Sequence, residues 1–126
     1  MIFDTDVMIW AFRGNPRALK AIDDASSRAI SAVTYMELLQ GVRNKDEMRE
    51  MKRFLSKLSF STLPITANIS NRATAIKEET ALRSDLGVCD ALIFATACET
   101  GETLLSGNKK HFKEVALLNA KEFKPE

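Results

Sequence analysis

The sequence predicts an α/β protein with three layers, α/β/α, built on a central parallel sheet of four to five strands. Short apolar stretches with the composition of buried strands recur along the chain, and segments with helical spacing of apolar residues separate them. The two kinds of segment alternate from end to end, which is typical of a parallel sheet covered by helices on both faces. The 126 residues suit one domain, which we expect to span residues 1–126.

The expected strands are short and evenly distributed. The first spans residues 1–5 and ends in Asp-Thr-Asp, the second spans 28–33, and the third spans 60–64. A fourth covers 103–106, and a weaker fifth is expected around 115–119. Crossovers between neighbouring parallel strands should be right-handed, which restricts how the intervening helices can be arranged.

Five segments have the pattern of helices. They cover residues 17–25, 34–42, 45–58, 66–83 and 89–99. The clearest apolar stripe, in the third of them, consists of Met48, Met51, Leu55 and Leu58. The last segment is apolar nearly all round, so we expect this helix to be buried in the middle of the fold.

Composition restricts the classes of function. A net charge of +1 is not that of a strongly basic nucleic-acid-binding protein. The lysines and arginines of residues 45–57 are interpreted as a solvated helix face, and a second basic group lies at 109–113. The sequence has no apolar run of membrane-spanning length, and it opens directly on Met1-Ile2-Phe3-Asp4, without the basic start of a secretory signal. We therefore expect a cytoplasmic protein.

The two cysteines are not expected to form a disulfide. Cys89 and Cys98 lie nine positions apart in one helical segment, so they point about 180° away from each other. We expect two reduced, buried thiols.

Polar side chains follow the expected carboxyl ends of the strands, where open parallel sheets bind ligands. Asp4 ends the first strand, and Glu37 lies one helical turn beyond the second. Asn108 follows the fourth strand, and Asp90 begins the buried helix that leads into that strand. These side chains are distant in sequence but should meet at one edge of the sheet.

Three unpaired carboxylates at that edge, those of Asp4, Glu37 and Asp90, would repel each other and raise each other's pKa values. A divalent cation removes this penalty, and ligation by oxygen alone favours Mg²⁺ or Mn²⁺. The chemistry that follows is metal-assisted attack of water on a phosphodiester. The sequence thus predicts a magnesium- or manganese-dependent phosphodiesterase site.

Each acid also has a purely structural interpretation. Thr34 and Glu37 match a capping box, Asp90 would favourably meet a helix dipole, and Asp4 could be an Asx-turn or N-cap residue. The prediction rests on their combination. His111, the only histidine, is expected to support the packing of Phe112 or to contact the backbone of a bound nucleic acid rather than to act as a base.

Three segments together resemble the PIN-domain family, and within it the VapC-type toxins of toxin–antitoxin pairs. Residues 1–9 are similar to the opening strand of the family with its first acid, Asp4. Residues 31–41 resemble the second motif, with its acid at Glu37, and residues 90–97 the third, with its acid at Asp90. The motifs occur in the family's order and separation, so the resemblance covers nearly the whole chain.

The resemblance implies a PIN-like fold and a metal-dependent endoribonuclease that is inhibited by a small antitoxin and is often a homodimer. Many members have a fourth acid where this chain has Asn108, whose amide oxygen can ligate a metal through a water but brings no charge. Asp6 stands where the family often has Asn or Ser, and with Ser106 it is expected to support the site. Lys109 or Lys110 is expected to hold the RNA backbone.

Three other functions are each compatible with part of the sequence. A haloacid-dehalogenase phosphatase would share the Asp-Thr-Asp start but needs a later acidic pair that the sequence lacks. A receiver domain needs a phosphoacceptor aspartate where the chain has Leu63-Pro64-Ile65. The stronger alternative is a non-catalytic PIN-like module that binds RNA or protein, and the intact set of three acids favours an enzyme over it.

Overall fold

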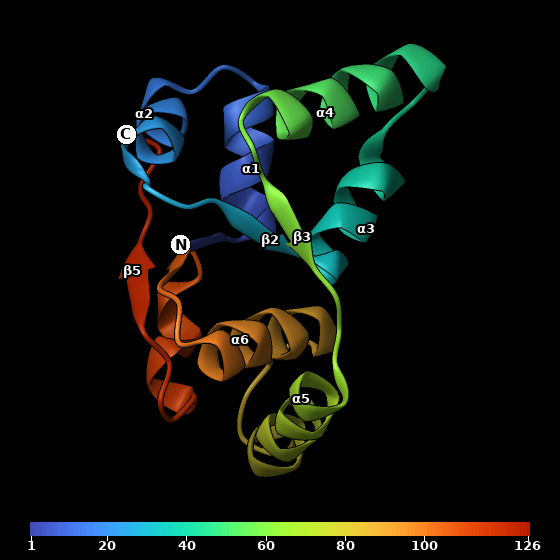
Figure 1. Ribbon diagram of the computed structural model, residues 1–126. Helices are drawn as coiled ribbons and strands as arrows, with labels where there is room; N and C mark the ends of the chain where they lie inside the picture. The colour runs from blue at the N-terminus through green and yellow to red at the C-terminus, as the bar shows by residue number, and fades with distance from the viewer.

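The computed structural model describes residues 1–126 and has the three layers expected from the sequence (Figure 1). All strand pairs of its five-stranded sheet are parallel, and the strand order is β3-β2-β1-β4-β5. The strands are β1 (Ile2–Phe3), β2 (Ala29–Ser31), β3 (Ser61–Leu63), β4 (Leu104–Ser106) and β5 (Ala120–Glu122). The first strand of the chain is therefore the central strand, so residues that follow it stand at the middle of the sheet edge.

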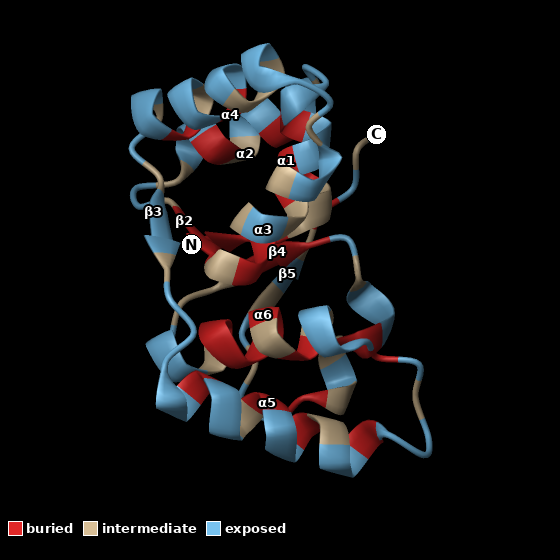
Figure 2. Ribbon diagram, turned by 90° about the vertical axis from the view of Figure 1, so that its right-hand side faces the viewer, coloured by how far each residue is buried: buried red, intermediate tan, exposed pale blue.

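Helices cover both faces of the sheet. They are α1 (Thr5–Phe12), α2 (Pro16–Asp24), α3 (Ala32–Gly41), α4 (Lys45–Lys57), α5 (Ala67–Thr80), α6 (Val88–Thr100) and the 3₁₀-helix η1 (Lys109–Glu114). Figure 2 shows α1, α2 and α4 on one side of the sheet and α6 on the other, with α5 outside α6. The predicted fold class is confirmed, and no helix combines the length and apolar character needed to cross a membrane.

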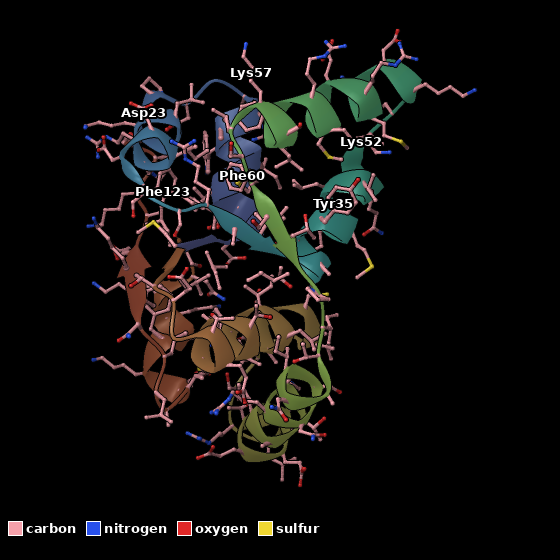
Figure 3. All side chains as sticks on the ribbon, in the orientation of Figure 1. Asp23, Tyr35, Lys52, Lys57, Phe60 and Phe123 are labelled. Atoms are coloured by element: carbon pink, nitrogen blue, oxygen red, sulfur yellow. The ribbon has the colours of Figure 1, made fainter.

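The sheet separates two apolar cores, because successive strand residues point to opposite faces. Ile2 and Leu104 belong to the core formed with α5 and α6, whereas their neighbours Phe3 and Leu105 belong to the core formed with α1, α2 and α4. Phe60 packs edge-to-face on Phe3, with ring centroids 5.5 Å apart, and thereby closes the second core beside β3 (Figure 3). As predicted, α6 is largely buried, and it lies between the sheet and α5.

The sequence analysis did not anticipate α1. Its apolar residues lie on several faces, with Met8 buried while Trp10 and Phe12 are each 37% exposed, so the sequence shows no amphipathic stripe. The start of α3 also differs from the expectation. Ser31 is its N-cap, and Thr34 lies inside the helix, so the capping-box interpretation of Thr34 and Glu37 is wrong.

The fifth strand lies at Ala120–Glu122 rather than around 115–119. Leu117 has a φ of 67° and is exposed, which turns the chain inside the predicted strand. Hydrogen bonds from Leu104 N to Asn119 O and from Phe123 N to Ser106 O fix the register of the strand on β4. Backbone pairing, rather than apolar composition, therefore selects these polar residues for the sheet edge.

Both cysteines are free thiols, as expected, but only one is shielded. Cys98 is half-buried, whereas Cys89 is exposed in the first turn of α6, so the expectation of two buried thiols is wrong. The first turn of α6 stands at the sheet edge beyond the core, which leaves Cys89 in solvent next to Asp90.

Candidate functional site

A cavity of about 450 Å³ lies at the carboxyl ends of the central strands. It brings together the three acids expected from the sequence, the amide that follows β4, and two basic side chains. Its lining consists of Asp4, Thr5, Asp6, Ile9, Glu37, Asp85, Asp90, Asn108, Lys110 and His111. Only one of these residues is apolar, so the cavity is suited to charged or hydrated ligands.

Asp4 is 4% exposed and begins α1 as its N-cap. One carboxylate oxygen accepts a hydrogen bond from Thr5 N at 2.7 Å, and the other accepts one from the hydroxyl of Ser106 at 2.6 Å. Burial raises the pKa of Asp4 to about 7, the charge of Asp6 acts in the same direction, and the Ser106 hydrogen bond opposes both. The predicted supporting residue Ser106 thus fixes the orientation of the most buried acid.

Glu37 comes from the middle of α3, one turn beyond the end of β2, and is half-buried. Its carboxylate accepts a hydrogen bond from the Thr5 hydroxyl at 2.6 Å. The same hydroxyl lies 3.0 Å from that of Thr34, which is fully buried in α3. Thr5 was not expected at the site, because a threonine in a predicted turn carries no chemical signal.

Asp90 lies in the first turn of α6, opposite Asn108. The Asn108 side-chain amide donates to Asp90 Oδ2 at 3.2 Å, and the Asn108 backbone N–H donates to Ser106 Oγ at 3.0 Å. Burial, followed by the charge of Glu37, raises the pKa of Asp90. Asn108 therefore occupies the place expected for the fourth acid and contacts the third acid directly.

Asp6 connects two turns of the site. Its carboxylate accepts hydrogen bonds from Val7 N at 2.8 Å and from Gly107 N at 2.9 Å. Burial raises the pKa of Asp6. A Cβ at position 107 would lie only 2.5 Å from Asp6 Oδ2, so a larger residue there would have to displace the Asp6 carboxylate. The sequence analysis did not single out Gly107.

The basic side chains of the cavity are paired with acids at its rim. Lys110 Nζ lies 3.2 Å from Asp85, and this hydrogen bond holds the pKa of Asp85 below its usual range. The ring nitrogens of the buried His111 lie 3.1 Å from Asp85 and 3.0 Å from Glu114. His111 therefore joins η1 to the loop before α6, a contact that the sequence analysis did not anticipate.

Lys109 does not line the cavity. It lies 3.4 Å from Glu122 on β5. Of the two lysines expected to meet RNA, only Lys110 faces the acids.

The chemistry of the donor set fits a hard divalent cation. None of Asp4, Asp6, Glu37 and Asp90 forms an ion pair, although all four line one cavity. Carboxylate and amide oxygens are the donors that Mg²⁺ and Mn²⁺ prefer, and such ions often keep waters between themselves and the protein. The acids surround the cavity rather than converging on one point, since no three acidic, histidine or cysteine side chains form a ready ligand cluster.

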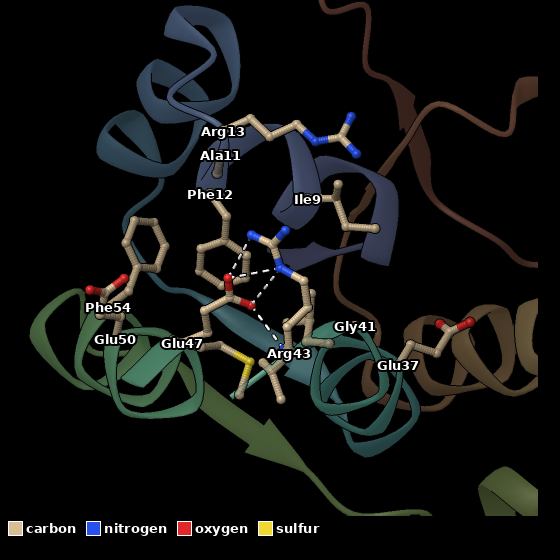
Figure 4. A pocket seen from close by; sticks show the side chains of 13 residues that line it. Ile9, Ala11, Phe12, Arg13, Glu37, Gly41, Arg43, Glu47, Glu50 and Phe54 are labelled. Carbon is tan, nitrogen blue, oxygen red and sulfur yellow. Dashed lines mark hydrogen bonds and ion pairs between the residues drawn. The ribbon is translucent and has the colours of Figure 1, made fainter. Parts of the chain in front are cut away.

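A second cavity of about 610 Å³ runs between α1, α3 and α4 (Figure 4). Phe12 and Phe54 pack edge-to-face on its wall with ring centroids 4.8 Å apart, and Arg43 pairs with Glu47 at 2.7 Å on its rim. Phe12 thus both packs against α4 and faces the groove. Glu37 and Ile9 line both cavities, so the apolar groove adjoins the acidic one.

The fold and this site define a class of α/β proteins that carry acids at the carboxyl ends of a parallel sheet. A family model described as PIN domain matches residues 1–118. The chain belongs to the PIN domain family, as its three motifs predicted. Comparison with curated proteins gives no match.

Several solved structures are similar over almost the whole chain. One, a toxin–antitoxin complex from Klebsiella pneumoniae, shares 28% identity with a TM-score of 0.75, covering 99% of this chain and 97% of that chain. VapBC-1 from nontypeable Haemophilus influenzae shares 19% identity with a TM-score of 0.82, covering 97% and 98%. VapBC2 from Rickettsia felis bound to a DNA fragment from their promoter shares 21% identity with a TM-score of 0.80, covering 98% and 100%. The last two likenesses concern the fold alone.

Proposed function

We propose that the chain is an endoribonuclease that hydrolyses RNA phosphodiester bonds with Mg²⁺ or Mn²⁺ and serves as the toxin of a toxin–antitoxin pair. Asp4, Glu37 and Asp90 hold the cation, directly or through water. A cation bound there supplies activation of a water for attack and neutralisation of charge that develops on the phosphate. The observation that carries the proposal is a cavity lined by five carboxylates, of which four form no ion pair.

The other residues of the cavity have supporting roles in this proposal. Ser106 and Asn108 orient Asp4 and Asp90 through the hydrogen bonds described above. Asp6 holds the turn that carries Asn108. Lys110 stands at the rim, where its ammonium group can exchange Asp85 for a phosphate of the RNA backbone. Lys109, already paired with Glu122, is the weaker candidate for this contact.

The test is cleavage of a labelled structured RNA by the purified chain with Mg²⁺ or Mn²⁺, and again with EDTA. We expect EDTA, Asp4→Ala and Asp90→Asn each to abolish cleavage, while Asp90→Asn leaves the circular dichroism spectrum near that of the wild type. Glu78→Gln, which changes an exposed acid on α5, is the matched control and should leave cleavage unchanged. Cleavage that persists in EDTA, or a fully active Asp90→Asn protein, would contradict the proposal.

The second candidate is a non-catalytic module that binds RNA or protein through the same fold. Calorimetry with Mn²⁺, on the wild-type chain and on Asp90→Asn, distinguishes this module from the enzyme. Absence of both cleavage and metal binding would favour this module, whereas metal binding that Asp90→Asn removes would favour the enzyme.

Two protein partners complete the proposal. The apolar groove between α1, α3 and α4 adjoins the acidic cavity through Glu37, so an antitoxin segment bound there would restrict access to the acids. Similarity to a chain of a toxin–antitoxin complex supports this partner. We also propose that the chain forms a homodimer. Masses from light scattering, for the chain alone and mixed with a candidate antitoxin, test both assemblies: a monomeric mass would contradict the homodimer, and an unchanged mass the complex.

A further inference from the structure

One hydrogen bond at the site joins two residues that no motif connects. The hydroxyl of Thr5, the first residue of α1, lies 2.6 Å from Glu37 Oε1 on α3, 32 positions along the chain. It is the only hydrogen bond that the Glu37 carboxylate makes, and Glu37 has no ion pair. By contrast, both oxygens of Asp4 are held by hydrogen bonds. Thr5 is therefore the only hydrogen-bond partner that orients the Glu37 carboxylate.

The position of the Thr5 hydroxyl is itself fixed. Its oxygen lies 3.0 Å from the hydroxyl of Thr34, which is fully buried one turn before Glu37 on α3. Thr5 has one hydroxyl proton, and the carboxylate takes it because a hydrogen bond to a charged acceptor is the stronger one. Thr34 then donates to the oxygen of Thr5. The result is a row of two hydrogen bonds, from the buried Thr34 hydroxyl to Thr5 and from Thr5 to the Glu37 carboxylate.

The Glu37 side chain borders two cavities, so a hydrogen bond that holds it in one of them matters. It lines both the acidic cavity and the apolar groove, and its side chain is long and half-buried. Figure 4 shows it at one end of the groove, far from Phe54 and Glu50. Without a fixed partner the carboxylate would be free to leave the other acids, and holding it in place would cost side-chain entropy at each binding event.

We propose that Thr5 is a positioning residue, whose hydroxyl, supported by Thr34, holds the carboxylate of Glu37 in the acidic cavity for a divalent cation. The inference rests on the proposed metal-dependent function. Partners that orient ligands in this way commonly account for about 10- to 100-fold of metal affinity. In this proposal Thr5 is not itself a ligand of the cation and acts through Glu37.

The experiment measures the Kd for Mn²⁺ by calorimetry for the wild type, Thr5→Val and Thr5→Ser. Valine keeps the shape of the side chain and removes the hydroxyl, whereas serine restores the hydroxyl. We expect Thr5→Val to raise the Kd at least about 10-fold and Thr5→Ser to remain within about 3-fold of the wild type. Thr96→Val is the matched control, because Thr96 is also buried but donates to the backbone of its own helix, outside the cavity.

The outcomes separate the inference from the proposed function. Thermal melts in EDTA identify variants that fail to fold. If Thr5→Val fails to fold, Thr5→Ala takes its place in the experiment. If the wild type binds Mn²⁺ and the variant without the hydroxyl binds it with the same Kd, the role of Thr5 is overturned and the metal site stands. A wild-type chain that binds no Mn²⁺ would overturn the metal site and the inference together. A raised Kd in Thr96→Val equal to that in Thr5→Val would also overturn the positioning role.

Discussion

Asp4 has a structural role and a candidate chemical role at the same time. Its carboxylate caps α1 through Thr5 N and also accepts from Ser106, and it lines the cavity. The N-cap interpretation of this residue is therefore correct, and it does not exclude metal binding. The burial of Asp4 makes its charge costly when no cation is present.

The raised pKa of Asp4 predicts how stability depends on pH without metal. A carboxyl with a pKa of about 7 in the folded chain and 3.8 in the unfolded chain favours unfolding once it is ionised. The contribution of Asp4 to the free energy of unfolding should therefore decrease as pH rises from about 4 to 7. In EDTA, we expect Asp4→Asn to melt at least about 3 °C above the wild type at pH 8 and to lose this advantage at pH 4.

Glu78→Gln, in an exposed position, is the control and should change the melting temperature little at either pH. A gain for Asp4→Asn of the same size at pH 4 and pH 8 would show that the effect does not come from ionisation.

At this scale the sequence could supply the acids but not their partners. Asp4, Glu37, Asp90 and Asn108 could be named because each follows an expected strand end or opens a helix beside it. The contacts of Thr5, Gly107 and Asp85 depend on distances across the fold, which no local pattern encodes. The pairing of His111 with two acids was missed for the same reason.

Among the elements, the turns after β1 and β4 form one unit. Asp6, in the first turn of α1, accepts from Gly107 N just beyond β4, and Asn108 follows immediately. A side chain at position 107 would displace the carboxylate of Asp6, because its Cβ would lie 2.5 Å from Asp6 Oδ2. The hydrogen bond from Gly107 to Asp6 therefore ties the two turns to each other.

Gly107→Ala should separate these turns. We expect a loss of about 1–3 kcal/mol in the free energy of unfolding, from overpacking and the broken hydrogen bond, together with weaker Mn²⁺ binding. Gly41→Ala is the control, because a Cβ there meets nothing within 4 Å. Urea denaturation measures the first effect and calorimetry the second, and equal stability of the two variants would contradict the close approach.

Elements with a clear stripe or a continuous apolar run were predicted well, and α4 and α6 begin and end within one residue of their expected bounds. The smaller errors displace the start of α3 and the end of α5. The larger errors fall on α1, whose apolar residues surround the helix, and on β5, whose three residues are mostly polar. Both elements are defined by their neighbours: α1 by the sheet it covers, and β5 by its pairing with β4. The composition of a segment alone cannot show that the segment forms a helix or strand because of contacts with distant parts of the chain.

Over the whole molecule, the sheet divides the apolar interior into two cores. Ile30 belongs to the core with α1, α2 and α4, and Ile93 to the core with α5 and α6. Both side chains are at most 1% exposed. The two cores are linked through backbone pairing rather than through shared side-chain packing.

Small cavities in the two cores should therefore act independently. Ile30→Val and Ile93→Val are each expected to lower the free energy of unfolding by about 0.5–1.5 kcal/mol. Their double variant should show the sum within about 0.5 kcal/mol in urea denaturation. A larger deviation from the sum would indicate that packing in one core affects packing in the other across the sheet.

The architecture as a whole was the most predictable level, because alternation of strands and helices leaves few arrangements that bury both faces of a sheet. The strand order, with β1 at the centre, is harder to predict from the sequence than the fold class. It depends on β1 pairing with both β2 and β4, and the second of these contacts joins residues about a hundred positions apart.

That central position of β1 also bears on synthesis. The ribosome releases Asp4 102 positions before Ser106, which together with Asn108 holds Asp4 and Asp90. Until β4 has left the exit tunnel, the middle of the sheet has no second neighbour, and the turn after β1 has nothing to close against. The nascent chain therefore carries its acids unassembled, so any activity of this cavity begins only after β4 has been synthesised and has paired with β1.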